Sequence, residues 1–283
     1  MTIRNSKFLR HNTDRKAILR MDNDISIHKG IWVFIEIEEK AIAITPREKS
    51  VAKVSLELIS EARKLASKLD TEVSAILLGH EVEGIAQTIL SYGVDNIYLI
   101  DHPSLCEFND ERYAKAIIEL VNRYRPDIFL LGATVRGRSL APRIASALNT
   151  GLTADCTQLD IDPEKKILLQ TRPAFGGDLM ATIICPECRP QMATVRPGVF
   201  EVSKYEGKVA GKIIKPEIII SGSKIEILQY IEDTTESFNI SEAEIIVAAG
   251  RGIGEKKNLK LVEELASMIG GQVGASRAIV EAG

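Results

Sequence analysis

Short apolar runs alternate with amphipathic helical segments from residue 30 to residue 132, and this alternation constrains the fold more than any other feature. The first run, residues 30–36, is rich in β-branched and aromatic residues and predicts a buried strand. In residues 51–69, apolar side chains recur at spacings of three and four, with charged residues between them, which predicts an amphipathic helix. Because neighbouring parallel strands need a long return connection, this order predicts an α/β fold with a parallel sheet.

The same alternation continues along the chain. Further strands are predicted at residues 72–79, 96–100 and 127–132, and further helices at residues 82–92 and 110–124. Three β-like runs separated by Pro and Gly follow at residues 166–171, 179–185 and 191–195, and we expect extra strands there rather than another strand–helix unit.

Four segments follow from this pattern. They are an N-terminal extension at 1–29, an α/β domain with a parallel sheet at 30–200, a connecting segment at 201–243 and the start of a second α/β domain at 244–283. We expect the connecting segment to pair with the sheet or with a partner. The last segment is too short to bury its own core. It therefore packs on the first domain or belongs to a longer, truncated domain.

Composition excludes several classes of protein. With 36 Lys and Arg against 39 Asp and Glu in 283 residues, the chain lacks the excess of cations that a general nucleic-acid binder needs. Its apolar runs are far shorter than the ~20 residues that span a bilayer, so we expect no membrane insertion. Four cysteines in a chain of this length fit a reducing compartment, and we expect a cytoplasmic protein.

The glycine-rich loop at residues 249–254 is the main candidate for ligand binding. It follows a predicted strand and precedes a helix, where backbone N–H groups receive phosphates. Its G-x-G-x-G spacing differs from the dinucleotide fingerprint, so a tight turn without a ligand is the alternative. Arg251 favours phosphate because arginine pairs bidentately with it. Ser276 and Arg277 end the next predicted strand and could meet the same ligand, unless Arg277 is simply a solvated residue.

A second candidate is the segment at residues 132–139, which also joins a predicted strand to a helix. Its polar side chains, Arg136, Arg138 and Ser139, could hold an anion. They could equally contact a partner or cap the helix.

The pair Cys185 and Cys188 has C-x-x-C spacing, but the chain offers few further ligands for zinc and the surroundings are β-like rather than helical. We interpret them as two incidental thiols and expect no metal site. No Ser/His/Asp or Cys/His arrangement predicts a nucleophile, so no catalytic residue is expected.

Four motifs, taken together, carry a family resemblance. They are R-P-A-F-G-G at 172–177, R-P-Q-M-A-T-V-R-P-G at 189–198, A-A-G-R-G at 248–252 and G-A-S-R at 274–277, supported by residues 140–143 and 149–155. In this order the chain closely resembles the alpha subunit of electron transfer flavoprotein from about residue 30 to residue 283. The resemblance implies a heterodimer with a beta subunit, a first domain of nucleotide-binding-like α/β type that forms much of the subunit contact, and a second α/β domain that holds FAD.

The resemblance also implies site residues and a role. Arg251 and Gly252 of the loop, together with Ser276 and Arg277, would contact the flavin dinucleotide. The loop arginine suits the diphosphate, and a cation near the isoalloxazine raises the flavin potential. The chain would be an electron carrier between a dehydrogenase and a redox acceptor rather than a stand-alone catalyst.

The sequence departs from the family pattern in two respects. Family members continue with further glycine-rich segments that complete the FAD site, so we expect this chain alone to bind FAD weakly or not at all. The N-terminal extension, which in some relatives is an iron–sulfur module, contains no cysteine. Two alternatives stay open: an adenine-nucleotide-binding module that uses residues 132–139, and a subunit that only scaffolds a partner.

Overall fold

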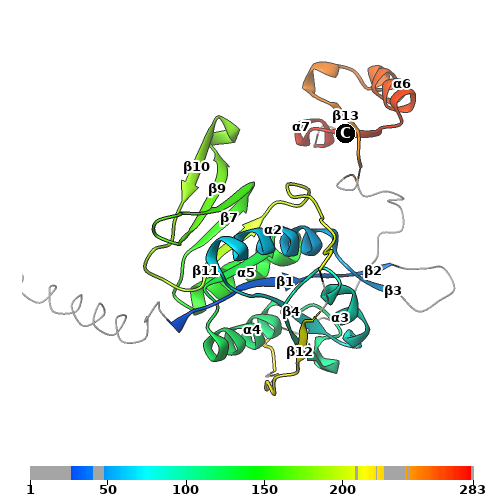
Figure 1. Ribbon diagram of the computed structural model, residues 1–283. Helices are drawn as coiled ribbons and strands as arrows, with labels where there is room; N and C mark the ends of the chain where they lie inside the picture. The colour runs from blue at the N-terminus through cyan, green and yellow to red at the C-terminus, as the bar shows by residue number, and fades with distance from the viewer. Residues whose placement is uncertain are drawn as a thin grey trace, which may run out of the picture. The chain divides into compact units, whose positions relative to one another are not determined.

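The computed structural model describes residues 27–40, 48–207, 210–220, 222–225, 240 and 243–281 (Figure 1). The chain divides into two compact units, Met1–Ile227 and Leu228–Gly283. Most of the predicted N-terminal extension and part of the connecting segment lie outside the described residues. The finer boundaries drawn from the sequence, at residues 29, 200 and 243, stay predictions.

Within its described part, the first unit is built on a seven-stranded sheet whose paired strands all run parallel. The strand order is β12-β5-β4-β1-β6-β11-β7. The strands are β1 (Ile31–Ile35), β4 (Val73–Gly79), β5 (Asn96–Asp101), β6 (Ile128–Gly132), β7 (Leu152–Cys156), β11 (Gln191–Val195) and β12 (Lys212–Ile214). The predicted α/β fold with a parallel sheet is therefore confirmed.

Helices cover both faces of this sheet (Figure 1). They are α2 (Lys53–Leu69), α3 (Glu83–Leu90), α4 (Asp110–Tyr124) and α5 (Val135–Ala147). Alternate residues of β1 enter different cores: Val33 packs with α2 and α3, whereas Trp32 and Phe34 pack with α4 and α5. Since the strand is buried on both faces, its sequence is a continuous apolar run rather than an alternating one.

The region after β7 differs in part from the prediction. Two of the predicted runs, 166–171 and 179–185, are present as β9 (Leu168–Ala174) and β10 (Leu179–Ile183). They form an antiparallel sheet with β8 (Gln158–Ile161), a strand that the sequence did not predict. The run at 191–195, however, is β11, which lies inside the main sheet between β6 and β7. β12 pairs with β5, so the connecting segment does pair with the sheet. A small hairpin, β2 (Ile37–Lys40) and β3 (Glu48–Val51), completes the unit's strands in the described ranges.

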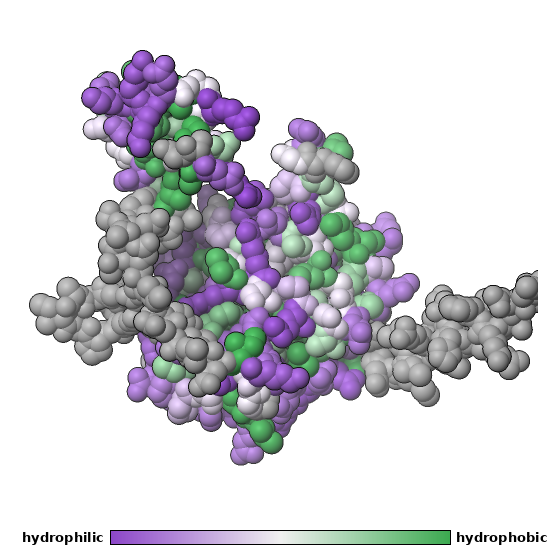
Figure 2. Space-filling model, turned by 180° about the vertical axis from the view of Figure 1, so that it is seen from behind, coloured by the Kyte–Doolittle hydropathy of each residue, from purple (hydrophilic) through white to green (hydrophobic). Residues whose placement is uncertain are grey.

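The second unit is a strand–helix–strand piece. Its strands β13 (Ile246–Ala249) and β14 (Gln272–Ala275) are parallel, and α6 (Leu259–Ile269) connects them. Three short helices complete it: η5 (Arg251–Ile253), η6 (Lys256–Asn258) and α7 (Arg277–Val280). Among its described residues only Ala249, Ala266 and Gly274 are buried, and Figure 2 shows hydrophobic residues open to solvent beside hydrophilic ones. In the described ranges of the whole chain, no helix has the length and apolar character needed to cross a membrane.

Candidate functional site

Strands β13 and β14 of the second unit end side by side, and this shared end defines the candidate site. Ala249 and Ala275, the last residues of the two strands, are partners in the register. The N–H of Ser276 donates to the carbonyl of Ala249 over 2.9 Å. The two segments that leave the strands therefore begin at one edge, the carboxyl edge where open parallel sheets collect ligands.

The loop after β13 presents bare backbone to solvent. It forms one short turn, in which the N–H of Ile253 donates to the carbonyl of Gly250 over 3.0 Å. A Cβ added at Gly250 or Gly252 would meet no atom within 4 Å, so no crowding inside the described structure requires glycine at these two positions. Gly254 differs, because its φ of +74° is a conformation that favours glycine. The open backbone leaves room for a close approach to a ligand.

The side chains at this edge are polar and accessible. Arg251 is exposed within the loop. Ser276 precedes α7, and its hydroxyl makes no capping hydrogen bond there. Arg277 is 90% exposed, and its Nε donates to Glu281 Oε1 over 2.6 Å. Such an exposed pair contributes little to stability, so the guanidinium is free to exchange this partner for a ligand.

The structure thus places Arg251 and Gly252 after one strand and Ser276 and Arg277 after its parallel neighbour. Together they offer two guanidinium groups, one hydroxyl and the backbone N–H groups of a glycine loop. This donor set is suited to an anionic ligand with carbonyl or phosphate oxygens.

Two family models match this chain, and one of them covers this edge. Residues 41–220 match the model of the electron transfer flavoprotein domain, and residues 239–283 match that of the electron transfer flavoprotein FAD-binding domain. The electron transfer flavoprotein subunit alpha of Thermoanaerobacterium thermosaccharolyticum is 49% identical, over 90% of this chain and 75% of the relative. The chain belongs to the electron transfer flavoprotein alpha-subunit family. The resemblance drawn from the four motifs is confirmed.

Other relatives carry related names. The electron transfer flavoprotein subunit alpha of Clostridium acetobutylicum is 46% identical over 90% of this chain and 74% of its own length. A protein of Anaerotignum propionicum named acryloyl-CoA reductase electron transfer subunit beta is 39% identical over 92% of this chain and 76% of its own length. The match to the FAD-binding domain is short and covers the second unit's candidate edge. Flavin binding is thus a property of the family to which this alpha subunit belongs.

The second sequence candidate, residues 132–139, is engaged within the first unit of this alpha-subunit family member. Arg136 Nη1 donates to the carbonyl of Ile37 over 3.0 Å. Arg138 pairs with Asp155 at 2.9 Å, and Ser139 donates to Asp110 over 2.8 Å. All three side chains that were candidates for an anion therefore have protein partners. A sequence alone does not reveal these partners, because they come from other segments of the chain.

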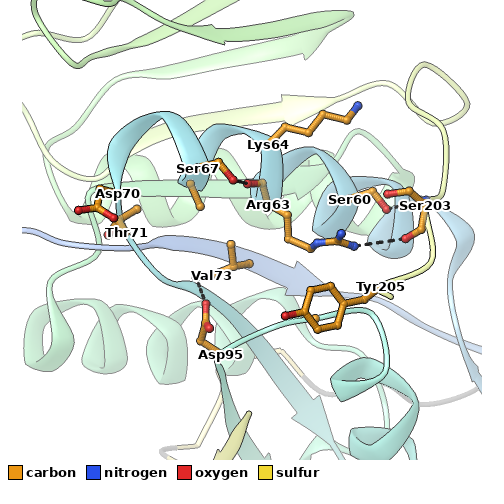
Figure 3. A pocket seen from close by; sticks show the side chains of 12 residues that line it. Ser60, Arg63, Lys64, Ser67, Asp70, Thr71, Val73, Asp95, Ser203 and Tyr205 are labelled. Atoms are coloured by element: carbon orange, nitrogen blue, oxygen red, sulfur yellow. Dashed lines mark hydrogen bonds between the residues drawn. The ribbon is translucent and has the colours of Figure 1, made fainter. Parts of the chain in front are cut away.

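A cavity of about 380 Å³ lies at the amino ends of β4 and β5, beside α2 (Figure 3). Arg63 crosses it, donating to the carbonyls of Tyr92 over 3.1 Å and of Ser203 over 3.4 Å. Its guanidinium lies 4.8 Å from the centre of the Tyr205 ring. The Arg63 guanidinium thus holds the segment around Ser203 against α2. The cavity also lies opposite the edge at which ligands of parallel sheets collect.

Cys185 and Cys188 are free, half-buried thiols. Cys185 Sγ lies 3.6 Å from the carbonyl oxygen of Cys188, and burial raises the pKa of the Cys188 thiol. Within the ranges that the structure describes, no group of three or more His, Cys, Asp or Glu residues is arranged to hold a metal ion.

Proposed function

We propose that this alpha subunit holds FAD at the β13–β14 edge and, together with a beta subunit, carries electrons between a dehydrogenase and a redox acceptor. The observation that carries the proposal is the shared end of the two parallel strands. It brings the loop of Arg251 and the Ser276–Arg277 segment to one edge, inside the region that matches the FAD-binding domain. When bound, the isoalloxazine of FAD supplies the reversible uptake of electrons.

The donors at this edge fit the polar parts of FAD. The open backbone at Gly250 and Gly252, with the Arg251 guanidinium beside it, suits the negatively charged diphosphate. The Ser276 hydroxyl and the Arg277 guanidinium suit the carbonyl oxygens of the isoalloxazine. No proton-abstracting residue is needed, so the protein's part is binding, orientation and electrostatics.

Arg277 would tune the redox behaviour. A cation beside the isoalloxazine raises its reduction potential, because it offsets the negative charge gained on reduction. In this structure Glu281 holds that cation through a hydrogen bond of 2.6 Å. When FAD binds, the Arg277 guanidinium would therefore exchange its solvent-exposed partner Glu281 for the flavin.

We also propose that the chain alone holds FAD weakly or not at all. The described part of the second unit offers an open edge with three buried residues, rather than an enclosed crevice. A beta subunit would complete the carrier. The cytoplasm is our proposed compartment, because all four cysteines are free thiols.

An absorbance spectrum tests the proposal. The chain is co-expressed with the product of its adjacent gene, purified, and measured in the visible range before and after dithionite. A flavin spectrum that bleaches is expected, and the chain purified alone is the control, expected to be colourless or nearly so. A stable, colourless complex would refute the carrier role. Tight binding of AMP or ATP by that complex would then favour the nucleotide-binding alternative.

A further inference from the structure

The strand order of the first unit creates a second place where a ligand would be expected. From β1 the chain proceeds to β4 and β5 on one side of the sheet, and later to β6 on the other side. In open α/β sheets, ligands bind outside the carboxyl ends of the strands at such a reversal. Here that place lies between the end of β1, which is followed by Glu36, and the turn from β6 into α5.

Two glycines shape this place. A Cβ at Gly137, in the first turn of α5, would lie only 1.8 Å from the carbonyl oxygen of Gly132. A Cβ at Gly132 would lie 2.9 Å from Glu36 Oε1. The end of β6, the first turn of α5 and the Glu36 carboxylate can therefore meet only because both positions lack a side chain. Glycines in a strand-to-helix turn serve nucleotide sites in the same way, by letting a phosphate approach the backbone.

The Glu36 carboxylate lies at this strand-to-helix turn. Glu36 is only 6% exposed. Both of its oxygens lie 2.8 Å from Thr134 Oγ1, which donates to them. Thr134 is the N-cap of α5 and accepts the N–H of Gly137 over 3.0 Å. The negative charge is thus held at the positive end of a 13-residue helix.

The surroundings of Glu36 include groups that destabilise its charged form and groups that stabilise it. Burial raises the pKa of Glu36, while the Thr134 hydrogen bond and the nearby Arg136 guanidinium act to lower it, and Glu38 acts to raise it. The Arg136 side chain is itself fixed by the Ile37 carbonyl and lies 5.4 Å from the Phe108 ring centre. Arg136 therefore acts on the Glu36 carboxyl through its charge alone, while its hydrogen bond goes to the Ile37 carbonyl.

We propose that Glu36 is the built-in occupant of an anion site in the first unit, and that its carboxylate excludes the phosphates of nucleotides, FAD included, from the reversal point of the sheet. The proposal concerns the first unit alone and stands whether or not the second unit binds flavin. It explains why a unit with a nucleotide-binding topology would leave FAD to the other unit.

The test removes the Glu36 carboxylate from the site. Glu36→Ala in the full chain leaves a space of carboxylate size facing Thr134 and the α5 terminus. Its Tm is measured in sodium formate and in sodium chloride at equal ionic strength, then with inorganic phosphate. We expect saturating formate to raise the Tm of Glu36→Ala by about 3 °C relative to chloride and to leave the wild-type Tm unchanged, because an anion that binds only the folded state stabilises it.

Two controls keep the test decisive. Glu38→Ala removes an exposed carboxylate from the next strand and should show no difference between the two salts. Equal responses of Glu36→Ala and wild type would overturn the proposal. A second measurement does not depend on that variant folding: the wild-type chain is titrated with phosphate and with AMP. If the wild-type chain binds phosphate or AMP and Thr134→Val loses this binding, the proposal is overturned. If the wild-type chain binds neither ligand, the proposal is supported.

Discussion

At the residue scale, Arg277 is where the proposed flavin site can be tested most directly. Removing its guanidinium in Arg277→Ala should lower the flavin reduction potential of the complex by roughly 30 mV, the equivalent of ~1.4 kcal/mol in a two-electron couple. The potential is measured by spectroelectrochemical titration. Arg277→Lys keeps a positive charge and should recover part of the shift. An unchanged potential in Arg277→Ala would place this side chain away from the isoalloxazine.

Glu111 is a second informative residue, because it binds Ser223 and Lys224, in the segment that leads to the second unit. Its carboxylate accepts from Ser223 Oγ over 2.7 Å and from the N–H of Lys224 over 2.9 Å, and it pairs with Lys115 at 2.9 Å. These bonds lower its pKa to about 2, with the Lys115 hydrogen bond as the largest cause. The pKa is depressed in the folded state. The stabilising contribution is therefore present above the unfolded pKa of ~4.3 and is lost as pH falls toward 2.

We therefore expect the Glu111 carboxyl to titrate near pH 2 when followed by NMR. Glu111→Gln should remove this part of the acid sensitivity between pH 4.5 and 2 and speed hydrogen exchange at the Lys224 amide. Glu119→Gln is the matched control and should change neither. A Glu111 titration near the ordinary value would mean that the contacts with Ser223 and Lys224 do not persist in solution.

At the element scale, α4 shows how a helix packs in this fold. Leu120 is fully buried against the sheet, so Leu120→Ala should lower the free energy of unfolding by about 3 kcal/mol through lost burial and the cavity left behind. Glu119→Ala, one residue earlier on the exposed face, should change it by less than about 0.5 kcal/mol. Chemical denaturation of both variants measures the difference. Equal stabilities would mean that α4 does not pack tightly on the sheet.

The same helix shows what a sequence can predict. Its bounds, residues 110–124, were predicted as observed, because local signals set both ends. Asn109 caps the start by accepting two backbone N–H groups, and Arg125 ends the helix in a left-handed conformation before Pro126. The glycine loop at 250–254 was found for the same reason: a strand, a loop and a helix follow one another along the chain.

Positions in the fold that depend on distant partners were not predicted. β7 was missed, because only Thr153 and Cys156 among its residues are buried and it contains no apolar run. β11 was predicted as a strand, but its place inside the main sheet depends on β6 and β7, which come much earlier in the chain. Glu36 was seen only as the end of a strand. Its role depends on the approach of Thr134, 98 residues away.

At the scale of the whole molecule, the two units should differ sharply in autonomy. Both hydrophobic cores that the described residues form lie in the first unit, whereas the described part of the second unit buries three residues. A chain of residues 1–227 should therefore unfold cooperatively, with a Tm within about 3 °C of the complete chain, and residues 228–283 alone should show no cooperative transition. Circular dichroism with heating distinguishes these outcomes. A cooperative transition in the short piece would show that it has a core of its own.

The position of β11 between β6 and β7 also sets an order of events during synthesis. β7 leaves the ribosome well before β11, yet in the described structure β11 is the strand that pairs with it in the main sheet. Until residues 191–195 have emerged, β6 is an open edge of buried apolar residues, and α5 has only part of the surface on which it packs. A nascent chain stopped before residue 191 would therefore carry an unfinished sheet and would be a substrate for chaperones.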